Sequence, residues 1–118
     1  MRGVDKKLFE ACWNWDADLA QECIANGANV NAQDEDGWTP SHWAVSLSCA
    51  PLLSTILSSG NVDLSIKNMK SETPSDMAMS IFLYTSKLKE STDYIDDVIK
   101  LIKSYQRAPS IPNRAPQP

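Results

Sequence analysis

Two short sequence features recur along the chain at nearly the same interval, and this repeat limits the possible folds more than any other feature. Gly27 and Gly60 are 33 residues apart, and each ends an apolar stretch, AQECIANG and LSTILSSG. Thr39-Pro40 and Thr73-Pro74 are 34 residues apart, and each begins one, TPSHWAV and TPSDMAM. Periods of about 20–50 residues are typical of proteins built by stacking one small structural unit.

The recurring residues suit the ends of helices. Thr39 and Thr73 fit N-caps, because a hydroxyl accepts a hydrogen bond from a backbone N–H that has no partner in the first turn. The prolines that follow fit the first helical position, where a missing N–H costs nothing. Gly27 and Gly60 fit the left-handed position that ends a helix, and Gly37 fits a tight turn. The predicted unit is a turn, a short helix, a tight bend, a second helix and a glycine stop.

These features together resemble the ankyrin repeat family. The stretch NGANVNAQDEDGWTPSHWAV (26–45) is similar to the family's pattern, and LFEACWNWDADLAQECIANGANVN (8–31) resembles its usual N-terminal repeat. The resemblance implies an all-α fold, a solenoid of stacked helix-turn-helix units with hairpin-like corners. It places the repeats at about 6–34, 35–68 and 69–106, within a domain of residues 1–106. Trp15 and Ser48 depart from the pattern, since the family usually has glycine between the two helices.

The third repeat is predicted to be longer than the second. Apolar residues recur at helical spacing in two stretches of it, namely Met77, Ile81, Tyr84 and Leu88, and then Ile95, Val98, Ile99, Ile102 and Tyr105. Ser91 or Thr92 is expected to cap the second of these helices. The extension either caps the stack, as terminal repeats must, or forms an arm that itself binds a partner.

No catalytic constellation is found, so we expect neither an enzyme nor a cofactor. His42 is the single histidine, and the resemblance implies that its ring bonds to backbone and ties adjacent repeats together. Cys12 and Cys23 are expected at core positions as small apolar residues. The alternative is a metal or redox protein that uses Cys12, Cys23, Cys49 and His42.

The family's contact positions imply a non-enzymatic module that binds another protein in a concave groove. These positions are the corner tips and the exposed side of the first helix of each repeat. In this chain they are Trp13, Asn14, Glu35, Asp36, Trp38, Ser46, Leu47, Met69, Lys70, Glu72, Ser80 and Ile81. Trp15 is added because it stands where the family usually has glycine, so a large ring has to be accommodated at this bend. No nucleic acid is expected as a partner, since the net charge is −4, and a monomer is expected.

The four tryptophans all precede residue 44, and tryptophan is enriched at interface hot spots. Trp43 is predicted to lie in the core between repeats, and Trp38 to contact the partner. Trp13 and Trp15 are predicted either to pack on each other or to cover the N-terminal edge. Because Asp34, Glu35 and Asp36 lie beside Trp38, the predicted partner presents basic residues and an apolar anchor.

Residues 107–118 are predicted to form a disordered, proline-rich tail. Within it Pro109–Arg114 (PSIPNR) matches PxxPx[RK], which resembles ligands of Src-homology-3 domains, so an adaptor function of the tail is a second alternative. No apolar run approaches the roughly 18 residues that cross a bilayer, and the first residues do not resemble a signal peptide. We therefore expect a cytoplasmic or nuclear protein.

Overall fold

The computed structural model describes residues 2–107, and within them every regular element is an α-helix. The prediction of an all-α fold is thus confirmed. The helices are α1 (Gly3–Trp13), α2 (Ala17–Ala25), α3 (Pro40–Ser46), α4 (Ala50–Leu57), α5 (Pro74–Lys87) and α6 (Asp93–Arg107). None of them is long and apolar enough to span a membrane.

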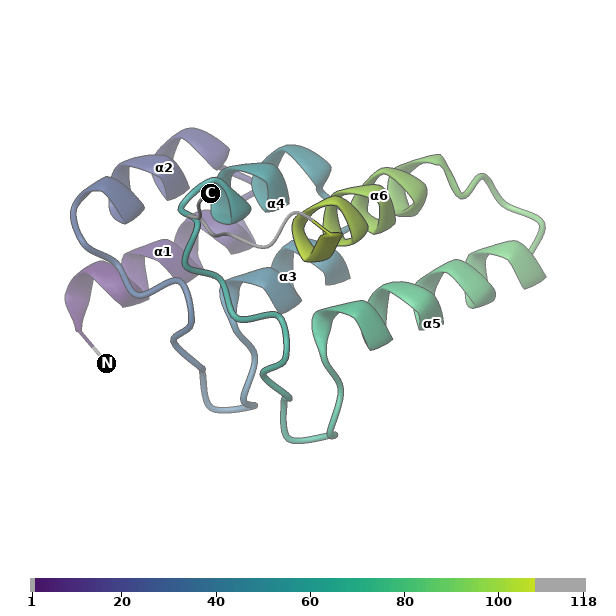
Figure 1. Cartoon of the computed structure of the whole chain (residues 1–118), viewed down its shortest axis with the longest axis horizontal. Coiled ribbons are helices and arrows are strands. Elements are labelled where there is room, and N and C mark those ends of the chain that lie inside the picture. The colour runs from purple at the N-terminus through teal and green to yellow at the C-terminus, as the bar shows by residue number, and fades with distance from the viewer. Residues whose placement is uncertain (1, 108–118) are drawn as a thin grey trace, which may run out of the picture.

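The helices stack in two rows (Figure 1). The inner row is α1, α3 and α5, and the outer row is α2, α4 and α6; neighbours within each row contact one another. One continuous apolar core runs between the rows, with Leu8, Leu52 and Val98 completely buried. The segments that enter α3 and α5 project from the same side of the stack as two hairpin-shaped corners (Figure 1).

The predicted helix starts are confirmed. The Thr39 hydroxyl accepts from the N–H of His42, and the Thr73 hydroxyl accepts from that of Asp76. In return, the side chains of His42 and Asp76 accept from the N–H groups of the two threonines, which completes a capping box at each site. The threonine and proline pairs therefore define where α3 and α5 begin.

The two corners have the same internal hydrogen bonds. Asp34 Oδ1 accepts from the N–H groups two and four residues later, at 2.9 and 3.0 Å. Asn68 Oδ1 does the same at 2.9 and 3.0 Å. The corners also touch, because Met69 N–H donates to the Asp36 carbonyl at 3.0 Å. Each corner is thus a rigid unit built around one side chain, and the second corner rests on the first.

His42 joins the second repeat to the third, as the resemblance implied. Its Nδ1 accepts from Thr39 N–H at 3.0 Å, so the ring proton is on Nε2. That Nε2 donates to the carbonyl of Glu72 at 2.9 Å. The imidazole is completely buried, and both of its nitrogens are occupied by structural bonds.

The third repeat is elongated, as predicted, but only part of its first apolar stripe is covered. α5 has 14 residues and α6 has 15, against 7 for α3 and 8 for α4. Met77 is buried, whereas Tyr84 is 67% and Leu88 50% exposed. The reason is that α3 is only half as long as α5, so the last two turns of α5 extend beyond their neighbour. The stripe on α6 packs as expected, with Ile95, Val98 and Ile102 buried.

The bends between paired helices carry residues in the left-handed region where the family usually has glycine. Trp15 has φ of 57° and Ser48 has φ of 52°. This conformation costs a non-glycine residue about 1–2 kcal/mol. Part of that cost is avoided if glycine occupies the position.

Replacing Ser48 with glycine should therefore raise the free energy of unfolding by about 0.5–1 kcal/mol. The matched control is Ser58→Gly, because Ser58 ends α4 with an ordinary φ of −64°. There glycine brings no relief, adds backbone entropy to the unfolded chain and removes the bond that the Ser58 hydroxyl donates to the Ser54 carbonyl at 2.7 Å, so stability should fall. Urea denaturation followed by tryptophan fluorescence measures both changes; a loss of stability in both variants would contradict the strain argument.

Candidate functional site

The most distinctive surface feature lies between α1, α3 and the first corner. It is a cleft of about 670 Å³, and we call it the aromatic cleft. Its lining combines three aromatic rings with three carboxylates and consists of Lys6, Phe9, Trp13, Gln33, Asp34, Glu35, Asp36 and Trp43. The predicted contact residues Trp13, Glu35 and Asp36 thus lie around one cleft.

The rings of the aromatic cleft are held in a fixed arrangement. Trp13 and Trp43 are nearly perpendicular, with 6.0 Å between their centroids and 76° between their planes. Phe9 is buried, with its ring centroid 6.4 Å from that of Trp13. Trp13 is 47% exposed, so its ring is available to a partner.

Asp34 connects the aromatic and acidic parts of the cleft. Its Oδ2 accepts from the indole N–H of Trp43 at 2.9 Å, and its Oδ1 accepts the two backbone bonds that shape the corner. One carboxylate therefore fixes both the loop and the orientation of the Trp43 ring. Glu35 and Asp36 are exposed at the rim.

Sequence reasoning assigned Trp43 to the core, and its half-buried ring does pack against the core. The same ring also lines the aromatic cleft, which the sequence analysis did not anticipate. Trp38 is half-buried as well and packs against Trp43, with 4.6 Å between ring centroids and 50° between the ring planes. Trp38 therefore contacts one of the rings of the cleft without lining the cleft itself.

Three of the remaining predicted contact residues meet at a second place, where the inner and outer helices are joined. Trp15, Leu47 and Ile81 line a shallow hollow there together with Tyr94. Trp15 is 58% exposed. Trp13 and Trp15 therefore lie at different hollows, Trp13 beside Phe9 and Trp43 and Trp15 beside Leu47 and Ile81.

The other predicted contact residues are spread along the corner and inner-helix side. Met69 is 77% exposed at the tip of the second corner, next to exposed Lys70. Glu72 is half-buried, and its carboxylate accepts from the Asn68 amide. Asn14 and Ser80 are exposed and Ser46 is half-buried.

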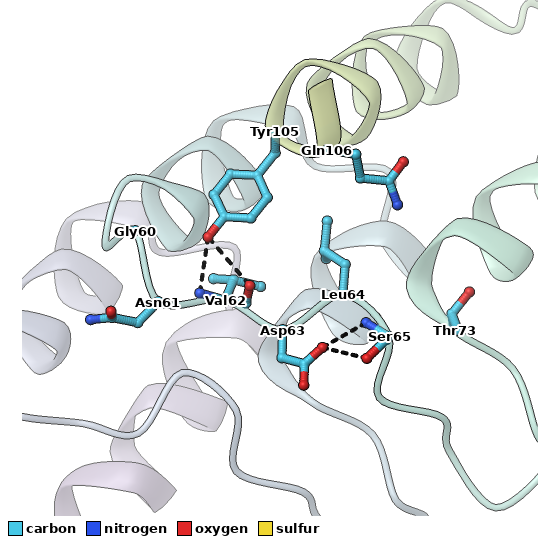
Figure 2. A pocket seen from close by; sticks show the side chains of 9 residues that line it. All are labelled: Gly60, Asn61, Val62, Asp63, Leu64, Ser65, Thr73, Tyr105 and Gln106. Carbon is cyan, nitrogen blue, oxygen red and sulfur yellow. Dashed lines mark hydrogen bonds between the residues drawn. The ribbon is translucent and has the colours of Figure 1, made fainter. Parts of the chain in front are cut away.

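A third hollow lies under the end of α6, and several polar groups that line it bond to one another (Figure 2). The Tyr105 hydroxyl accepts from Val62 N–H at 3.1 Å and donates to the Val62 carbonyl at 3.3 Å. The Asp63 carboxylate accepts from the backbone N–H and the hydroxyl of Ser65, and these bonds lower its pKa. The two Tyr105 bonds therefore attach the end of α6 to the loop that follows α4.

The four residues of the alternative metal or redox site are all buried, namely Cys12, Cys23, Cys49 and His42. Burial, followed by the nearby thiols of Cys23 and Cys49, raises the pKa of Cys12 to about 12, so this thiol stays protonated. Burial also raises the pKa of Cys23 and lowers that of His42. Within residues 2–107, no three His, Cys, Asp or Glu side chains gather in a group suited to a metal ion.

The tail predicted to act as a Src-homology-3 ligand, Pro109–Arg114, lies outside the residues that the structure describes. The adaptor hypothesis accordingly stays a prediction from sequence. The same holds for the limits of the proposed domain and tail.

Two rows of helices with corners projecting on one side define a helical repeat solenoid, a class whose members use the extended surface along the stack for binding. Residues 16–48 match the family model described as "Ankyrin repeats (many copies)". This part of the chain is thus similar to ankyrin repeats. Such repeats are in general protein–protein interaction modules and are not typically enzymes.

Three characterised proteins are similar to this chain over part of its length. Rabankyrin-5 of Mus musculus is 35% identical over 68 residues, which are 57% of this chain and 6% of that protein. The 2-5A-dependent ribonuclease of Homo sapiens is 44% identical over 54 residues, 45% of this chain and 7% of that protein. The ankyrin repeat protein FPV245 of Fowlpox virus (strain NVSL) is 35% identical over 71 residues, 60% of this chain and 16% of that protein. The similarity thus spans a small part of each relative.

Proposed function

We propose that this chain is a non-enzymatic module that binds one partner protein along the side formed by its inner helices and corners. The observation that carries the proposal is the aromatic cleft, where the half-exposed ring of Trp13 lies beside three carboxylates. A monomer acting in the cytoplasm or nucleus is part of the proposal, since three free, buried cysteines suit a reducing compartment.

The cleft has the composition of an interface anchor. Tryptophan buries a large area while few rotors are frozen, which is why it dominates many binding energies. The carboxylates of Glu35 and Asp36 at the rim attract a basic segment and speed its approach. The partner segment that fits this surface therefore carries basic residues and one side chain that inserts between the rings.

The ribonuclease activity named for the human relative is not part of the proposal, because the match covers 7% of that protein. The shared feature is the repeat, and a fold of this kind supports many different functions. Binding through the surface of the stack requires nothing beyond the residues that the repeats themselves supply.

The test compares affinity capture from native extract by the full chain and by two variants, with mass spectrometry as the readout. Trp13→Ala and the double variant Glu35→Lys/Asp36→Lys should each reduce recovery of the specific partner at least about tenfold, since hot-spot truncations cost about 2 kcal/mol or more. All three altered side chains are exposed, so circular dichroism spectra should be unchanged. Undiminished capture by both variants would refute the proposal.

Tyr84→Ala provides the matched control. Tyr84 is a 67% exposed aromatic residue on α5, away from the aromatic cleft. Its loss removes a similar amount of exposed ring without touching the proposed anchor. Because Tyr84 is on the inner-helix side but outside the cleft, capture by this variant should fall far less than capture by Trp13→Ala.

A further inference from the structure

We propose that this chain has a second docking site, separate from the aromatic cleft, which receives an amphipathic helix of a partner protein. The site is the shallow hollow beside Trp15, of about 440 Å³, and we call it the bend hollow. Its lining consists of Trp15, Leu47, Ile81, Tyr94 and Ile95 with three serine or threonine side chains, and no charged side chain is among these lining residues. The occupant that suits it therefore presents apolar side chains.

Trp15 places an exposed ring at a bend that does not need one. The left-handed residues of the three bends that join inner to outer helices are Trp15, Ser48 and Lys89, with φ of 57°, 52° and 60°. Serine and lysine side chains are compatible with water, whereas Trp15 is 58% exposed. Backbone geometry does not account for the ring, because glycine adopts this conformation at less cost. Tryptophan is a common anchor of protein interfaces, so we assign the ring to binding.

The hollow exists because the helices of the third repeat are longer than those of the second. α5 and α6 have 14 and 15 residues, whereas α3 and α4 have 7 and 8. Figure 1 shows α5 continuing past the end of α3. The bend hollow lies in the resulting step, where Ile81 and Tyr94 of the long helices meet Trp15 and Leu47 of the first two bends. The apolar stripe of α5, which is buried at its start, continues beyond the hollow to Leu88, which is 50% exposed. The site thus extends an interface that the fold already uses.

A helix is the partner conformation that fits this step. It can lie where a longer α3 would lie, at the usual 8–10 Å between packed helix axes. The N–H groups of Leu47 and Ser48 already donate to carbonyls of α3, at 3.0 and 2.9 Å. Residues 2–107 also contain no strand whose edge could pair with an extended peptide. A helix needs neither, because it satisfies its own backbone groups, and its apolar residues at i, i+3, i+4 and i+7 enter the hollow.

The test selects peptides that bind the full chain from a phage-displayed library. Each peptide has about 14 residues of alanine, glutamate and lysine, enough for a short helix, with apolar residues randomised at i, i+3, i+4 and i+7. Peptides whose binding persists in the Trp13→Ala variant are kept, which sets aside ligands of the aromatic cleft.

Trp15→Gly should weaken binding of the kept peptides at least about tenfold, because it removes the proposed anchor ring. Glycine suits the left-handed bend, so this variant should remain folded, as circular dichroism checks. Leu83→Ala is the matched control, since Leu83 is 60% exposed on α5 and does not line the bend hollow. Its effect on binding should stay within about twofold. Proline at the centre of a kept peptide should abolish binding, because it breaks a helix.

Three results would overturn the inference: no peptide is kept, Trp15→Gly binds the kept peptides as tightly as the original chain, or the proline peptides bind equally well. Sedimentation equilibrium of the chain alone tests a further occupant. A dimer that Trp15→Gly dissociates would assign the hollow to a second copy of the chain and would also overturn the inference. The proposed function is judged separately, because its capture experiment depends on Trp13, Glu35 and Asp36, none of which lines the bend hollow.

Discussion

Replacing Gly37 with alanine should lower the free energy of unfolding by about 2–5 kcal/mol. Gly37 has φ of 78°, a conformation that costs a residue with a Cβ about 1–2 kcal/mol. In addition, a Cβ at this position would lie 2.9 Å from Met69 N and 3.1 Å from Asn68 Cα, both backbone atoms of the second corner. Such overpacking adds about 1–3 kcal/mol. Urea denaturation followed by tryptophan fluorescence measures the loss.

Gly27→Ala separates the two contributions. Gly27 also has a positive φ, of 92°, but a Cβ there would meet nothing within 4 Å. Its replacement should cost only the conformational part, about 1–2 kcal/mol. Equal losses in the two variants would contradict the idea that the first corner supports the second through close backbone contact.

Replacing His42 with leucine should lower stability by about 2–4 kcal/mol at pH 7.5. Leucine has a similar volume but leaves Thr39 N–H and the Glu72 carbonyl without the imidazole, and a buried polar group without a partner costs about 1–3 kcal/mol. The imidazole is one of the groups that connect the second and third repeats, together with the bond from Met69 N–H to the Asp36 carbonyl. A variant as stable as the original chain would show that water replaces the imidazole at no cost.

The same histidine should make stability depend on pH. Burial lowers the pKa of His42, opposed by its bond to the Glu72 carbonyl and by the charges of Asp34 and Glu72. The unfolded chain therefore binds a proton near the ordinary histidine pKa of 6.5, before the folded chain does. Stability is complete above pH 6.5 and falls as the pH decreases from there toward the folded pKa.

Because His42 is the single histidine, no other side chain has an ordinary pKa in this window. The His42→Leu variant should thus show a flat profile of unfolding free energy between pH 7 and pH 5, where the original chain declines. Denaturant titrations at half-unit pH steps test this. A parallel decline in the variant would assign the effect to carboxylates.

The residues that end helices were the most predictable part of this fold. The hydroxyls of Thr39 and Thr73 bond within the first turn of their own helix, and Pro40 occupies a position that needs no N–H. The spacing of the sequence is therefore sufficient to place these helix starts. The burial of Met77 was equally predictable from periodicity. The exposure of Tyr84 on the same stripe was not, because it depends on where α3 ends, and a helix pattern contains no information about the length of its neighbour.

The candidate site was predictable in composition but not in geometry. Glu35, Asp36 and Trp13 were singled out from their positions in the repeat. The role of Trp43 was missed, because a large ring can pack one face on the core and present the other to a cleft. The bond from its indole to Asp34 is the feature that sequence spacing, nine residues apart, did not suggest.

The unequal helix lengths have a practical consequence for engineering. At 1.5 Å per residue, α5 is about 21 Å long and α3 about 10 Å. A consensus repeat of ordinary size grafted after α6 would cover only about half of α5 and leave the turns around Leu83 and Leu88 in water. To lengthen this array, both helices of the third repeat should therefore be shortened first, or the added repeat should be built with helices as long as α5 and α6.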